Sequence, residues 1–157
     1  MADIEFNIAK GRIVELHNRV VNNDPTNSAL IIVILKTAES DATLKDYATL
    51  SALLAGSNVE ADFTNYARIV LDDGDLSAFT TDNTNDRNEV DFPDQTITDA
   101  GGATNNTTEK LLICYDSDTT GGTDANIVPL LAYDFVKTTD GSDLPIVVNS
   151  NGYYRAP

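Results

Sequence analysis

Two apolar runs of strand length, separated by a polar turn, constrain this sequence more than any other feature. The first run covers residues 110–115 (KLLICY) and the second covers residues 127–135 (IVPLLAYDF). Gly121 and Gly122 in the intervening turn allow positive φ, so we expect two long strands joined by a surface loop. Apolar side chains would point to both faces of the first strand, which predicts a position deep inside a sandwich.

Two helices are expected in the N-terminal half. Apolar residues recur at helical spacing over residues 7–21, although Gly11 within this stretch costs about 1 kcal/mol relative to alanine. A pair of short strands is the alternative there, because the stretch contains several β-branched residues. Residues 44–54 carry a leucine stripe that follows Thr43, a good N-cap, and ends at Gly56. We interpret the stripe as a lid over a sheet, with a partner-binding face as the alternative.

The remaining segments are short and separated by turn residues, which favours β-structure. Further strands are predicted at residues 29–35, 63–71, 87–92 and 95–98. Residues 145–148 and 153–154 would form a terminal hairpin, or one strand bent at Gly152. We therefore predict a single, mainly β (α+β) domain over residues 1–157. Its helix–strand–helix portion spans about 7–56, and an antiparallel β-sandwich of jelly-roll type spans about 59–155.

The charge balance limits the partners that this protein can bind. Ten lysine and arginine residues face 25 aspartate and glutamate residues, for a formal net charge of −15. Such a surface repels phosphate backbones and anionic lipids, so we expect neither nucleic-acid nor membrane binding. The longest apolar run, residues 29–35, is too short to cross a bilayer. The first residues lack a basic stretch followed by an apolar one, which predicts synthesis without a secretory signal.

Catalytic signatures are missing from the sequence. It contains no G-x-S-x-G, P-loop, dinucleotide-binding glycine motif or H-E-x-x-H. His17 is the only histidine, and we expect a surface or packing role for it rather than that of a catalytic base. Cys114 is the only cysteine and is interpreted as a small buried hydrophobe. We predict that the protein is not an enzyme, with glycan cleavage by a pair of carboxylates as a minor alternative.

The turn between the two long runs is the main candidate cation site, and the same reasoning applies to the acidic turns at residues 72–75 and 82–86. Asp116, Asp118 and Asp124 place carboxylate oxygens at close spacing, and calcium prefers such ligands. The glycine offset departs from the EF-hand pattern, and no closing glutamate follows. Acidic turns are also expected on so acidic a protein. Apart from this calcium candidate, we predict no cofactor.

Aromatic residues near the end of the chain offer another kind of site. Four of them could line a sugar site, although packing in the core or between subunits is the simpler role: Tyr133, Phe135, Tyr153 and Tyr154.

Several short segments together resemble small virion proteins of tailed bacteriophages. They are residues 66–68 (YAR), 84–87 (TNDR), 92–96 (FPDQT), 112–116 (LICYD) and 149–152 (NSNG). The sequence is similar to capsid decoration (cement) proteins, which sit on the head shell, often as trimers with a β-sandwich or jelly-roll core. The resemblance implies synthesis in the bacterial cytoplasm, a place on the capsid surface, and the major capsid protein as a partner. The alternative is a tail or head-fibre module that binds a host receptor or glycan.

Residues near the two termini are the predicted contacts with neighbouring subunits, because termini often reach neighbours. The predicted contact residues are Phe6, Arg12, Tyr153, Tyr154 and Arg155.

Overall fold

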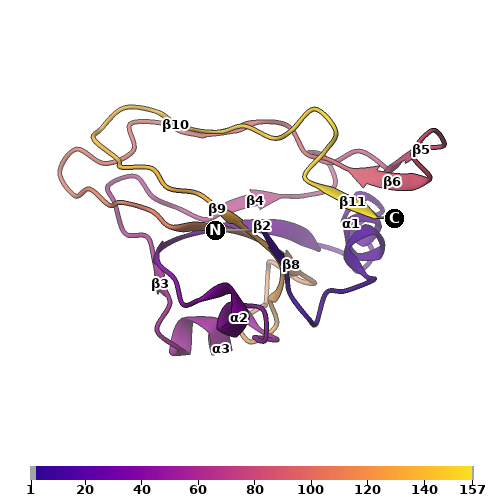
Figure 1. Ribbon diagram of the computed structural model, residues 1–157, viewed down its shortest axis with the longest axis horizontal. Helices are drawn as coiled ribbons and strands as arrows, with labels where there is room; N and C mark the ends of the chain where they lie inside the picture. The colour runs from indigo at the N-terminus through magenta and orange to yellow at the C-terminus, as the bar shows by residue number, and fades with distance from the viewer. Residues whose placement is uncertain (1–2, 157) are drawn as a thin grey trace.

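A central antiparallel sheet lies between two covering layers in the computed structural model, which describes residues 3–156 (Figure 1). Two small sheets lie on one face of the central sheet, and two short helices lie on the other. In chain order the elements are β1 (Ile4–Glu5), α1 (Ile13–Val21), β2 (Ala29–Thr37), α2 (Asp41–Leu44), α3 (Leu50–Ala55), β3 (Val59–Glu60), β4 (Ile69–Leu71), β5 (Thr80–Asp82), β6 (Arg87–Val90), β7 (Gln95–Ile97), β8 (Lys110–Asp116), β9 (Val128–Asp134), β10 (Leu144–Ile146) and β11 (Tyr154–Ala156).

The two longest apolar strands form the middle of this sheet. β2 and β8 pair antiparallel from Ala29 opposite Asp116 to Leu35 opposite Lys110. All of β8 is buried, as is β2 as far as Leu35. Side chains that alternate between the two faces of a strand can all be buried only if both faces are covered. The predicted deep position of the 110–115 strand is therefore confirmed.

The remaining strands complete three sheets. The central sheet has the order β1-β9-β8-β2-β3, and β4 also pairs with β2. The two small sheets have the orders β10-β7 and β11-β6-β5, and every pairing is antiparallel. The structure confirms the predicted mainly β antiparallel fold with helices in the N-terminal half. The predicted N-terminal portion and the β-rich remainder share one sheet, because β2 lies between β8 and the β3–β4 edge.

The first helix is shorter than predicted. It begins at Ile13, while residues 7–12 form turns. Gly11 has φ +73°, a left-handed conformation that a continuous right-handed helix cannot contain. Neither the helix from residue 7 nor the alternative pair of strands over residues 7–21 is correct.

The predicted helix over residues 44–54 is divided into α2 and α3. Its interruption coincides with a tertiary hydrogen bond in which the backbone N–H of Asn7 donates to the carbonyl of Lys45 at 2.9 Å. α3 then begins with a new cap, since the Thr49 side chain accepts a hydrogen bond from the N–H of Ala52. Thr43 therefore does not cap this helix, whereas Gly56 ends α3 as expected. The stripe itself is preserved, because three of its leucines are fully buried: Leu44, Leu50 and Leu53.

Two strand predictions are also wrong. The 63–71 strand is reduced to β4, and residues 64–65 form a turn. β10 pairs with β7 and β11 pairs with β6, so neither a terminal hairpin nor one bent strand forms. Gly152, with φ +83°, lies so close to β6 that an added Cβ would be 2.3 Å from the carbonyl oxygen of Val90. Only glycine fits this approach, which brings β11 against β6.

The outer edge of β2 changes partner along its length, and a tyrosine hydroxyl closes the junction. β2 pairs with β4 at Leu30–Ile32 and with β3 from Leu35 onward. Between these two pairings, the N–H of Ile34 donates to the hydroxyl of Tyr66 at 3.1 Å. That hydroxyl in turn donates to Glu60 Oε1 at 2.8 Å. Tyr66 thus takes the place of a strand carbonyl and satisfies a backbone donor that the changed pairing would leave without a partner.

We predict that Tyr66→Phe lowers the free energy of unfolding by about 1–3 kcal/mol, because it leaves the Ile34 N–H unsatisfied at a part-buried position. Urea unfolding would measure the change. Tyr47→Phe is the matched control, since the Tyr47 hydroxyl donates to Glu39 at 2.7 Å from a partly exposed ring. Water can replace that hydrogen bond, so the free energy of unfolding of the control should fall by less than about 1 kcal/mol. Equal losses in the two variants would contradict the role assigned to Tyr66.

Candidate functional site

The predicted calcium ligands are used for other contacts. Asp124 binds the guanidinium of Arg68 through both oxygens, at 2.6 and 3.0 Å. Asp118 Oδ1 accepts from the hydroxyl and the N–H of Thr120, at 2.6 and 3.0 Å. Asp116 is buried and accepts from the N–H of Asp118. Within residues 3–156, no three acidic, histidine or cysteine side chains converge as a metal site would require. The described residues of this loop therefore do not form a converged calcium site, and calcium binding there stays an untested prediction.

Arg68 is the centre of a part-buried ionic cluster that the sequence did not reveal. Its guanidinium also binds both oxygens of Glu60, at 2.8 and 2.7 Å, so it lies between two carboxylates. These bidentate bonds raise the pKa of Arg68 and lower that of Asp124. The cluster connects β3, the residues before β4 and the loop before β9. Its contribution is structural, because one guanidinium binds two carboxylates and so holds three segments together.

Lys110 forms a second ionic cluster at the start of β8. Its side chain is fully buried, and Nζ lies 2.7 Å from Asp41 Oδ1 and 2.6 Å from Asp134 Oδ1. Burial alone would lower the pKa of Lys110, but the bonds to the two carboxylates outweigh it and the pKa is raised. The ammonium stays charged and joins α2 to the β8–β9 pair. Lys110 begins the first apolar run and Asp134 lies next to the end of the second, and this was the one signal in the sequence for this contact.

The sole histidine is also buried and has a packing role. His17 Nε2 lies 2.8 Å from the carbonyl oxygen of Ser77, and Nδ1 lies 3.0 Å from the hydroxyl of Tyr153. A carbonyl only accepts, so Nε2 carries the hydrogen and Nδ1 accepts from Tyr153. Burial lowers the pKa of His17, which stabilises this neutral form. Cys114 is buried as expected, and its burial raises the pKa of the thiol.

The predicted contact residues divide into two groups. Phe6 is fully buried, and Tyr153 is 8% exposed and packs against Phe92 with ring centroids 5.0 Å apart. Both side chains belong to the core, so the prediction that they contact other subunits is wrong. Arg12 and Arg155 are exposed and Tyr154 is half-buried, so these three remain candidates.

The two terminal segments meet on one side of the molecule. One depression is lined by Lys10 and Gly11 from the N-terminal segment together with Tyr154 and Ala156 from β11. Burial and the nearby carboxylate of Glu5, in β1, raise the pKa of Tyr154. We call the surface formed by Glu5, Lys10, Arg12, Tyr154 and Arg155 the terminal face. It is the candidate functional site of this chain.

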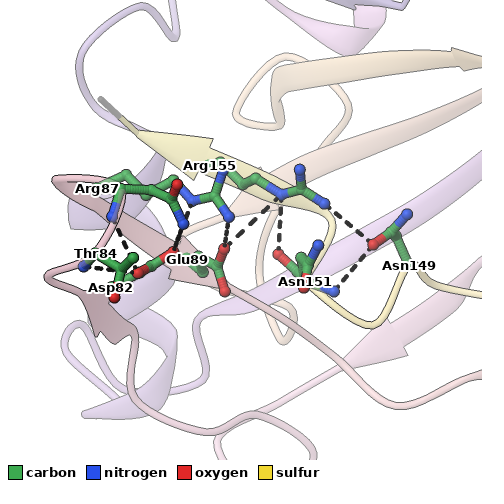
Figure 2. Close-up of polar contacts among 8 residues, drawn as sticks. Asp82, Thr84, Arg87, Glu89, Asn149, Asn151 and Arg155 are labelled. Carbon is green, nitrogen blue, oxygen red and sulfur yellow. Dashed lines mark hydrogen bonds and ion pairs between the residues drawn. The ribbon is translucent and has the colours of Figure 1, made fainter.

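Polar contacts fix the position of β11 on this face (Figure 2). Arg155 donates to Asn149 Oδ1 at 3.1 Å and to the carbonyl of Asn151 at 3.3 Å, and its Nε lies 3.9 Å from Glu89. Arg87, in turn, binds Glu89 at 2.8 Å and Asp82 at 3.2 Å. Figure 2 shows these side chains on β5, β6, β11 and the loop before β11, with the two arginines alternating with Asp82 and Glu89. The terminal face is therefore a preformed surface.

Comparisons with protein-family models, with curated protein sequences and with solved structures found no match to this chain. Over residues 3–156, no helix has the length and apolar character needed to cross a membrane.

We predict that calcium and chelator leave the melting temperature unchanged. A site saturated at about 100 times its dissociation constant would add about 2.7 kcal/mol, which calorimetry detects readily. Asp124→Asn should lower the free energy of unfolding by about 0.5–1 kcal/mol, equally in calcium and in EDTA, because it weakens only the contact with Arg68. A higher melting temperature in calcium, lost in Asp124→Asn, would contradict this interpretation.

We predict that stability falls with acidification through His17. Its folded pKa lies below the ordinary value of 6.5, so the unfolded chain binds more protons between these two values. The neutral His17 contributes fully to the free energy of unfolding above about pH 7. This contribution is lost as the pH falls toward the folded pKa, by no more than about 1.4 kcal/mol per pH unit. Melting temperatures measured from about pH 7 to 5.5 should fall in the wild type and stay nearly level in His17→Gln. A slope retained in the variant would assign the effect to another group.

Proposed function

We propose that this chain is a non-enzymatic structural protein of a tailed-bacteriophage virion. In this proposal it is a decoration protein that binds the outer surface of the major capsid shell and clamps neighbouring capsid subunits. The meeting of both terminal segments on one face carries the proposal, because a clamp needs one preformed surface that can dock on the shell. The resemblance of several short segments to small virion proteins supports the phage assignment.

The use of charge within the fold supports a structural role. Six of the ten basic residues form ion pairs within the chain: Arg19, Lys36, Arg68, Arg87, Lys110 and Arg155. The acidic excess therefore remains on the surface, where it keeps a crowded array of copies soluble. No ion pair within residues 3–156 involves Lys10 or Arg12, so two of the three cations of the terminal face are available to a partner.

Many acidic residues act as turn formers. Asp72 accepts from the N–H of Gly74, Asp82 from those of Thr84 and Asn85, and Asp140 from that of Ser142. Such turns stiffen loops without forming a reaction centre. A rigid body with polar loops and a defined docking face suits a protein that holds neighbours. By analogy with the resembling family, we propose a homotrimer, with the major capsid protein as the second partner.

The test is addition of the purified protein to heads of its own phage that were assembled without it. We predict saturable cosedimentation with the heads and a higher temperature of shell disruption. Arg12→Glu should weaken binding at least about tenfold, or about 1.4 kcal/mol, because it reverses a charge on the terminal face. Lys137→Glu makes the same change at an exposed position outside that face and should bind nearly as the wild type does.

Two outcomes would change the proposal. If the wild-type protein binds host cells saturably and not heads, the chain is a tail or head-fibre module. If the two charge reversals weaken binding equally, the terminal face is not the docking surface. The solution mass, measured by light scattering, tests the trimer separately.

A further inference from the structure

A cleft opens between the central sheet and the segment that follows β10. Its volume is about 290 Å³. The floor is formed by Leu111 and Ile113 of β8, and the opposite side by Ile146 and Val148. Three of the four predicted sugar-site aromatics, Tyr133, Phe135 and Tyr153, also line it, together with Phe92.

The size and lining of the cleft indicate what it can hold. Small-molecule sites usually occupy about 300–1,000 Å³, so this cleft is at the lower limit and suits one large side chain better than a cofactor. Its wall is mostly aliphatic and aromatic. The Tyr133 hydroxyl already donates to the carbonyl of Tyr153 and so does not require a ligand. An apolar group could therefore enter without leaving a buried polar atom unpaired.

The edge of the cleft is apolar and unusually exposed. Val147 lines it and is 74% exposed, the largest value among the exposed large hydrophobic residues. Val136 is comparably exposed, at 66%, but does not line the cleft. An exposed apolar edge beside a hollow is the arrangement found around the anchor side chain of a protein interface.

Charge distinguishes among possible occupants. The ionisable groups that line the cleft are Asp3, Asp134 and two tyrosines, and no basic side chain lines it. Asp134 is paired with Lys110, so Asp3 and the overall charge of −15 produce most of the local negative potential. A second copy docked through this same cleft would bring its own Asp3 against the first and be repelled there, so the proposed contacts between copies lie elsewhere. A partner with cations beside its apolar group would be attracted.

We propose that this cleft is a docking site for a segment of a partner protein that inserts one apolar side chain flanked by lysine or arginine. The side chain contacts Ile113 and Ile146, and its flanking cations lie over the acidic surface around Asp3. This inference does not depend on the proposed place of the chain in a virion. The cleft adjoins the terminal face through Tyr153, but none of the residues that define that face lines it.

Two blocked tripeptides, Lys-Phe-Lys and Glu-Phe-Glu, test the proposal with the full chain in solution. Methyl NMR titration should show shifts at Ile113, Ile146 and Val147 with the basic peptide. We expect its affinity to be at least about tenfold higher than that of the acidic peptide, and to fall as salt screens the charges. Equal affinities, or shifts confined to other methyl groups, would overturn the proposal.

A pair of valine substitutions provides the matched control. Val147→Arg places a cation at the edge of the cleft and should weaken binding of the basic peptide at least about tenfold. Val136→Arg makes the same change at an equally exposed site away from the cleft and should change affinity less than about twofold. Both positions are solvent-exposed, and melting curves would verify that the variants are folded. Equal weakening by both would show that general charge attraction, and not the cleft, binds the peptide.

Discussion

The pairing of β2 with β8 is the contact on which the rest of the structure depends. Both strands are buried on both faces along the paired stretch, so neither face of this pair can be left to solvent. The helices α2 and α3 cover one face, and the two small sheets cover the other. The remaining edges are closed by β9 and β1 on one side and by β3 and β4 on the other. Each covering layer therefore meets a requirement set by the central pair.

Charged groups stabilise the sites where the regular strand pairing of the central sheet changes or begins. Arg68 holds together three segments where β2 exchanges β4 for β3, and Lys110 connects α2 to the start of β8. Breaking such a buried or part-buried pair costs more than forming it gains, because the remaining partner loses both its solvent and its counter-charge. The ionic clusters thus favour one arrangement of the segments over others.

Much of the fold was predictable because the decisive pattern is local. Continuous apolar runs predicted β2 and β8 to within two residues at each end. Only α3 forms from the helix predicted over residues 44–54, and its earlier part is interrupted where Lys45 accepts a hydrogen bond from Asn7, a residue far away in sequence. The terminal hairpin failed for a similar reason, since β10 and β11 pair with β7 and β6 rather than with each other. Local propensity contains no information on either choice of partner.

The candidate site was less predictable than the fold. Phe6 and Tyr153 lie near the termini, as Tyr154 does, yet the first two are buried. An aromatic residue beside a chain end has the same sequence pattern whether it packs inward or faces a neighbour. Asp124 looked like a metal ligand because its partner, Arg68, lies far away in the sequence. Composition gave the acidic surface, but only the tertiary structure showed which charges are already paired.

The order of strands in the central sheet also determines how long β2 stays exposed while the chain is being synthesised. β2 ends at Thr37, whereas its central neighbour β8 begins at Lys110. At about 5–20 residues per second, a ribosome needs about 4–15 seconds to synthesise the intervening segment. During that interval the most apolar strand of the protein has emerged without the neighbour that buries it. A ribosome that stalls just before β8 leaves a fragment in which β2 has only its short partners β3 and β4 and one long edge is uncovered, so complete translation protects this protein from aggregation.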